Sequence, residues 1–124
     1  VTGGNGDLGR ALVPFLIAQG HEVVSVDLAL PPALVPGARH LVADVGDFGQ
    51  LVGCLRDCEA AIHLAALRSP LHHPEHVVYA ANTVGSYNLL SAAAALGIAR
   101  VCLASSINAT GAAFSRHPRF DYFP

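Results

Sequence analysis

The sequence contains no lysine, because its seven basic residues other than histidine are all arginine. Charged residues of both signs make up only 13% of the 124 residues, and the formal net charge is -2. The arginines are scattered along the chain, so the basic surface that nucleic-acid binding requires is missing. We therefore expect no nucleic-acid partner.

Long apolar runs and secretion signals are absent as well. No stretch approaches the roughly 18 apolar residues of a membrane span, and the first residues lack the charged and apolar regions of a signal peptide. Three cysteines are an odd number for a disulfide framework, so we expect free thiols at Cys54, Cys58 and Cys102. These absences predict a cytoplasmic protein with no membrane partner.

Hydrophobic residues make up 52% of the chain, which is enough for the core of one compact domain. Strand-type runs alternate with segments of helical spacing, and this alternation is typical of a parallel sheet with helices on both faces. The predicted helices cover residues 8–19, 48–57 and 76–96, and the predicted strands cover 21–28, 39–43, 60–65 and 99–104. The fold class we expect is α/β with a doubly wound parallel sheet.

The chain opens with VTGGNGDLG, which places Gly3, Gly6 and Gly9 between the end of a strand and the start of a helix. A dinucleotide site needs one glycine for a tight turn, one where backbone approaches the diphosphate, and one where helix and strand pack closely. Asp27 ends the next predicted strand, where a carboxylate accepts hydrogen bonds from ribose and repels the extra phosphate of NADP. The pattern predicts an NAD site, and the alternative is a glycine-rich turn that binds no nucleotide.

Five motifs in order resemble the extended short-chain dehydrogenase/reductase superfamily, the NAD-dependent epimerase/dehydratase group. TGGNGDLG is similar to its TGxxGxxG motif, VADVGD to its adenine-binding acidic segment, HLAA at 63–66 to the segment lining the cofactor, ANTVGSYNLLSAA to its helix with an ordering asparagine, and ASS at 104–106 to its serine element. The resemblance implies a Rossmann-like fold. The implied cofactor-binding residues are Gly3, Gly6, Asp7, Leu8, Gly9, Asp27, Asp44, Val45, Leu64, Ala65, Ala66, Asn82, Ala104 and Ser105.

The same resemblance implies a reaction. Members transfer hydride between NAD and a hydroxyl of a sugar or nucleotide-sugar, and Ser106 falls on the family's catalytic serine. A serine beside the nicotinamide stabilises the substrate oxygen as its charge changes. SSINATG is somewhat closer to the corresponding element of uronate dehydrogenases than to that of galactose epimerases.

The family's general acid/base is a tyrosine whose pKa is lowered by a lysine four residues later. This chain has Tyr79, Tyr87 and Tyr122 but no lysine, so it cannot supply that pair. We favour the interpretation that residues 1–124 are the NAD-binding part of a longer enzyme, truncated at both ends and inactive alone. The alternative is a non-catalytic NAD(P)-binding sensor or binding module.

The remaining candidates concern charge, metal and partners. Asp7 stands where the family commonly has an apolar or aromatic residue, and an acid near a diphosphate is unfavourable unless its side chain points away. Arg68 and Asn108 are candidate substrate residues, because an arginine there can pair with an anionic group; alternatively Arg68 is an ordinary surface residue.

The histidine cluster of His72, His73 and His76 is interrupted by Pro74, so we expect no metal. The resemblance also implies a homodimer that uses the helix containing Asn82.

Overall fold

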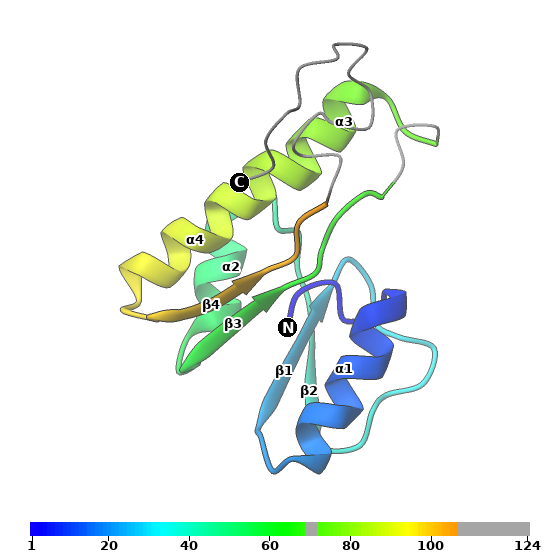
Figure 1. Cartoon of the computed structure of the whole chain (residues 1–124), viewed down its shortest axis with the longest axis vertical. Helices are drawn as coiled ribbons and strands as arrows, with labels where there is room; N and C mark the ends of the chain where they lie inside the picture. Colours follow the sequence, from blue (N-terminus) through cyan, green and yellow to red (C-terminus); the bar gives the residue numbers. More distant parts are fainter. Residues whose placement is uncertain (69–71, 107–124) are drawn as a thin grey trace, which may run out of the picture.

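The sheet is built around Thr2, which lies between two pairs of parallel strands in the computed structural model. The structure describes residues 1–68 and 72–106. β1 (Val23–Asp27) pairs with β2 (Ala38–Val42), and β3 (Ala60–His63) pairs with β4 (Arg100–Leu103). Thr2 forms parallel bridges to Val26 of β1 and to His63 of β3, so the spatial order is β2, β1, Thr2, β3, β4 (Figure 1). This order confirms the predicted doubly wound sheet, because the chain begins at the centre and crosses to both sides.

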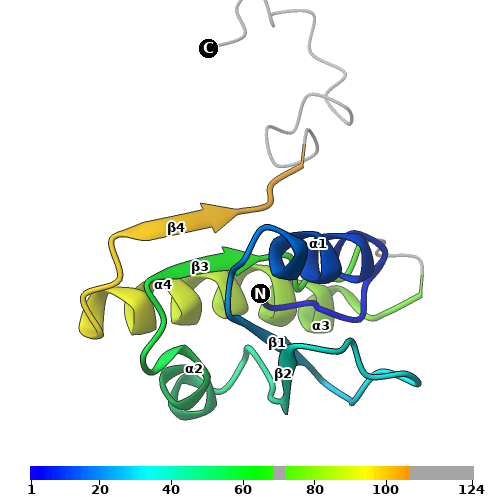
Figure 2. The same cartoon turned by 90° about the horizontal axis from the view of Figure 1, so that it is seen from below.

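Helices cover both faces of this sheet. α1 (Asp7–Ala18) lies on one face, and α2 (Phe48–Leu55) and α4 (Gly85–Ala95) lie on the other (Figure 2). The predicted third helix consists of α3 (Glu75–Tyr79), a π-helical segment η1 (Ala80–Val84) and α4, which follow one another without a break. None of the helices in the described ranges is long and apolar enough to cross a membrane.

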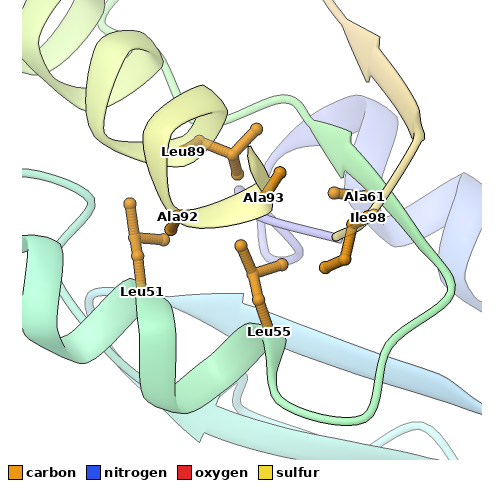
Figure 3. Packing of buried hydrophobic residues seen from close by; sticks show 7 residues of the cluster. All are labelled: Leu51, Leu55, Ala61, Leu89, Ala92, Ala93 and Ile98. Carbon is orange, nitrogen blue, oxygen red and sulfur yellow. The ribbon is translucent and has the colours of Figure 1, made fainter. Parts of the chain in front are cut away.

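The main hydrophobic core lies between α2, α4 and the β3–β4 pair (Figure 3). Leu51 and Leu89 are fully buried where these two helices meet. Burial of a leucine side chain contributes about 1.5–3 kcal/mol to folding. Ala92 and Ala93 are small enough to let α4 pack closely against its neighbours. This core fixes α4 beneath the strands whose carboxyl ends carry residues 64–68 and 104–106.

A cavity of about 910 Å³ lies at the amino ends of the strands, away from the glycine loop. The backbone nitrogen of Val1 lies in this region and donates a hydrogen bond to the Val24 carbonyl oxygen at 2.7 Å. In doubly wound sheets ligands bind at the carboxyl ends, so the candidate site lies at the other edge.

Candidate functional site

The predicted site residues gather at the carboxyl edge of the sheet. The segments that follow Thr2, β1, β2, β3 and β4 all leave the sheet at this edge (Figure 1). The candidates that the sequence predicts on these segments are Gly3, Gly6, Asp27, Asp44, Val45, Leu64, Ala65, Ala66, Arg68, Ala104, Ser105 and Ser106. Asp7, Leu8 and Gly9 form the first turn of α1. Asn82 lies in η1, and Asn108 lies outside the described residues.

At Gly3 and Gly9 of the glycine loop, backbone atoms occupy the space that a side chain would need. Gly3 has a φ of +69°, and a Cβ atom there would lie 2.6 Å from the backbone nitrogen of Ala65. A Cβ atom at Gly9 would overlap the carbonyl oxygen of Gly3 and would lie 2.6 Å from that of Gly4. Gly6 donates its N–H to the Gly3 carbonyl oxygen at 3.1 Å, which closes the turn before α1. The loop therefore needs glycine for its turn and for its contact with the helix, as the sequence pattern predicts.

The carboxylate of Asp27 holds the glycine loop at the end of β1. Its Oδ2 atom accepts the backbone N–H of Asn5 at 2.8 Å, and its Oδ1 atom accepts the N–H of Leu28 at 2.8 Å. The Asn5 side chain also donates to the Ala29 carbonyl oxygen at 2.6 Å. A carboxylate has about four acceptor positions, so Asp27 keeps acceptor capacity for a ligand beside the loop. Sequence reasoning identified Asp27 and missed Asn5, whose role depends on this tertiary contact.

The loop after β2 is held by a helix on the opposite side of the core. Asn88 of α4 is buried and donates to the carbonyl oxygens of Val45 and Gly46, at 3.1 and 2.9 Å. The Asp44 carboxylate accepts the N–H of Gly46 at 2.7 Å, which fixes its orientation in a local turn. A Cβ atom at Gly85 would lie 2.7 Å from a methyl carbon of Val45. Asn88 is a positioning residue that the sequence analysis did not assign.

Asn82 holds the segment after β3 through two hydrogen bonds to one residue. Its Oδ1 atom accepts the backbone N–H of Leu67 at 2.8 Å, and its Nδ2 atom donates to the Leu67 carbonyl oxygen at 2.9 Å. Asn82 lies in the π-helical segment, and such segments are frequent at functional sites. The ordering role that the resemblance implies for Asn82 stays a prediction, and these contacts give it a physical form.

Ser106 follows β4 on the neighbouring segment. The N–H of Ala104 donates to the carbonyl oxygen of His63 at 3.0 Å, so residues 104–106 leave the sheet beside residues 64–66. A pocket of about 510 Å³ lies along the segment that follows β3. It is lined by Ala66, Leu67, Arg68, His72 and His73. The structure thus brings the serine element and the HLAA segment together.

Asp7 is paired with two arginines rather than directed at an open loop. Its Oδ1 atom lies 3.0 Å from Nη2 of Arg10, and its Oδ2 atom lies 2.9 Å from Nη1 of Arg68. The hydrogen bond from Arg10 and the charge of Arg68 lower the pKa of this carboxyl group. All three side chains are exposed, so solvent screens these interactions. The acid is nevertheless neutralised at the first turn of α1.

His63 gives this site a pH-dependent contribution to stability. The side chain is only 3% exposed, its Nδ1 atom lies 2.6 Å from the Thr2 hydroxyl, and its Nε2 atom has no partner among the described residues. Burial lowers the pKa of this imidazole in the folded state. Because the unfolded chain then binds the proton more readily, we expect the free energy of unfolding to fall as pH drops below about 6.5.

Urea unfolding at pH 8 and at acidic pH measures this effect. His63→Asn should show a weaker pH dependence than the wild type, whereas His21→Asn, at an exposed position, should leave it unchanged. An unchanged pH dependence in His63→Asn would contradict the assignment of the effect to burial of this ring.

Comparisons with known proteins agree with this geometry. The model of the NAD dependent epimerase/dehydratase family matches residues 1–123. An uncharacterized protein of Mycobacterium tuberculosis is 32% identical over 86% of the chain. A solved mutant of uronate dehydrogenase from Agrobacterium tumefaciens, complexed with NAD, is 28% identical over 85% of the chain with a TM-score of 0.73. MoeE5 in complex with UDP-glucuronic acid and NAD is 32% identical over 85% of the chain with a TM-score of 0.76. The chain spans 12%, 39% and 35% of these three proteins, respectively.

Proposed function

Because the chain belongs to the NAD dependent epimerase/dehydratase family, we propose that it is the cofactor-binding part of an NAD-dependent oxidoreductase acting on a sugar or nucleotide-sugar. The observation that carries this proposal is the contact between the Asp27 carboxylate and the glycine loop, 2.8 Å from the Asn5 nitrogen. This contact supports the proposal, because a carboxylate beside such a glycine turn can accept hydrogen bonds from a ribose while the turn holds the diphosphate. A small-molecule substrate is the partner that this function requires.

The residues at the carboxyl edge fit a bound dinucleotide. The backbone N–H groups of the glycine loop and of the first turn of α1 would hold the diphosphate, because helix N-termini favour anions. Asp27 would bind the adenosine ribose, Asp44 and Val45 the adenine, and residues 64–66 the rest of the cofactor. Gly3 and Gly9 let the loop pack against Ala65 and the start of α1, and Gly6 is the glycine at which backbone would approach the diphosphate. When bound, NAD supplies the acceptor for the hydride.

Ser106 would act on the substrate rather than on the cofactor. Its place after β4, beside the segment after β3, is the position from which a hydroxyl can donate a hydrogen bond to a substrate oxygen. The relatives' names support the substrate class: one is a uronate dehydrogenase, and another was solved with UDP-glucuronic acid. The implied homodimer stays a prediction, and the exposed side chains of Tyr79, Tyr87 and Leu90 on α3 and α4 offer it an apolar surface.

Cofactor choice tests the proposal directly. Titration calorimetry should show that the protein binds NAD more tightly than NADP. Asp27→Asn keeps the shape and an acceptor for Asn5 but removes the charge. Hydrogen bonds to charged groups contribute about 1.5–3 kcal/mol, so NAD affinity should fall at least about tenfold and the preference over NADP should shrink. Glu22→Gln makes the same change at the amino end of β1 and should alter neither affinity.

The other possible results of these measurements each have a distinct interpretation. Tighter binding of NADP would contradict the role of Asp27. Binding of neither nucleotide would mean that the glycine turn serves no cofactor. NAD binding in the protein expressed from its complete reading frame, without turnover of any uronate or nucleotide-sugar, would support the sensor alternative.

A further inference from the structure

Arg68 connects the segment after β3 with the first turn of α1 through an ion pair. It follows Leu67, whose backbone is held by Asn82 through bonds of 2.8 and 2.9 Å, and its Nη1 atom lies 2.9 Å from Oδ2 of Asp7. Asp7 begins α1, so the guanidinium group of Arg68 stands at the N-terminus of that helix. The segment after β3 and the phosphate-binding turn are thus connected by one ion pair.

The charges at this helix end depend on the pairing. Asp7 alone would place a negative charge where an anion is expected to bind, and Arg10 and Arg68 together turn the local sum positive. The Arg68 side chain is 84% exposed and that of Asp7 is 60% exposed, so their pairing is weak and opens easily. A diphosphate arriving at the helix end competes with Asp7 for the guanidinium, because arginine binds phosphate through paired donors.

We propose that Arg68 exchanges its Asp7 partner for the diphosphate of the dinucleotide, so that Asp7 is a built-in competitor that limits cofactor affinity. The inference rests on the proposed function, since it requires the dinucleotide to bind at this loop. It assigns Arg68 to cofactor affinity and gives a role to the acid that the family pattern does not explain. Arg10 lies one turn farther along the same helix and bonds the other carboxylate oxygen, so it serves as the matched control.

A double-mutant cycle on NAD affinity tests the exchange. We expect Asp7→Asn to tighten NAD binding and Arg68→Gln to weaken it. If the pair must open on binding, Asp7→Asn should lower the Kd for NAD more in the wild-type background than in the Arg68→Gln background. The two changes in Kd should differ by about 1.4- to 5-fold. Fixed charges that do not exchange partners would give additive effects, which would overturn the proposal.

Two controls make the cycle specific. In the Asp7→Asn and Arg10→Gln cycle the two effects on NAD affinity should be additive. Arg10 lies on the same helix as Asp7, not on the segment after β3. The Arg68 coupling should vanish near 1 M salt, where the screening length is about 3 Å. All titrations are made at one fixed pH, because His72 and His73 line the same pocket as Arg68.

NAD binding by the wild type and the choice of ligand in the cycle distinguish failure of this inference from failure of the proposed function. A wild-type protein that does not bind NAD overturns both. Wild-type binding of NAD with an additive Asp7–Arg68 cycle overturns only the exchange. Adenosine lacks the diphosphate, so coupling of equal size with adenosine as the probe would show that the pair acts on another part of the ligand and would also overturn the proposal.

Discussion

Ser106→Ala is expected to lower kcat about 100- to 1,000-fold while the Kd for NAD stays within about twofold of the wild type. The reason is that a hydroxyl placed at the substrate oxygen is most valuable when that oxygen changes charge, and it contributes little to holding the cofactor. The measurement is the rate of NADH formation with a uronate or nucleotide-sugar, using the protein expressed from its complete reading frame. Calorimetry with NAD provides the second readout.

Ser105→Ala is the matched control for this loss. It makes the same chemical change one residue earlier, and neighbouring side chains of an extended chain point to opposite sides. Because Ser105 is among the implied cofactor-binding residues, we expect Ser105→Ala to change the Kd for NAD more than Ser106→Ala does, but to retain most of kcat. Equal losses in the two variants, or a large loss of NAD affinity in Ser106→Ala, would contradict a substrate role confined to Ser106.

Gly9→Ala is expected to lower the free energy of unfolding by about 1–3 kcal/mol and to weaken NAD binding at least about tenfold. The new methyl group would lie 2.6 Å from the Gly4 carbonyl oxygen and 2.7 Å from its carbonyl carbon, and it would also overlap the Gly3 oxygen. These atoms belong to backbone, so they cannot rotate away as a side chain would. Relief requires the loop and α1 to separate, which moves the N–H groups away from the diphosphate. Urea unfolding and calorimetry measure the two effects.

Gly53→Ala shows whether the loss is specific to the loop. Gly53 lies within α2, and a Cβ atom there would meet nothing within 4 Å. Alanine in a helix interior is favoured over glycine by about 1 kcal/mol, so this variant should be more stable than the wild type. A Gly9→Ala protein with normal stability and NAD affinity would show that the loop tolerates a side chain.

Local patterns predicted the order of elements, and tertiary contacts changed their details. The glycines at 20 and 97 end α1 and α4 with φ values of +87° and +72°, as their positions predict. The segment 76–96 was expected as one regular helix, yet residues 80–84 are π-helical. No residue type marks a π turn in the sequence. The same turn contains Asn82, whose partner Leu67 lies on another segment and is invisible to periodicity.

The candidate site likewise contains residues that local sequence predicts and residues that only tertiary contacts reveal. Glycine spacing and a strand-end acid identify Gly3, Gly9 and Asp27, because backbone geometry and charge at those positions follow from residue type. Asn88 could not be assigned in that way, because its partners Val45 and Gly46 precede it by more than forty residues. A buried amide within an otherwise apolar helix face is the signal that could have found it. The pairing of Asp7 with Arg68 is also set by the fold rather than by the sequence.

The two asparagines of the long helical run determine how far apart two loops of the site can be. Asn82 holds Leu67 and Asn88 holds the Val45–Gly46 turn, and Asn88 comes six positions after Asn82 in the helical run. At about 1.5 Å per residue of α-helix, this run, which includes the π-helical segment, sets an axial spacing of at most roughly 9 Å between the two residues. Insertion of one residue between them would rotate one amide by about 100° relative to the other. One helical run therefore sets the distance between the loop after β2 and the segment after β3, so under the proposed function its length helps to determine how a dinucleotide fits between them.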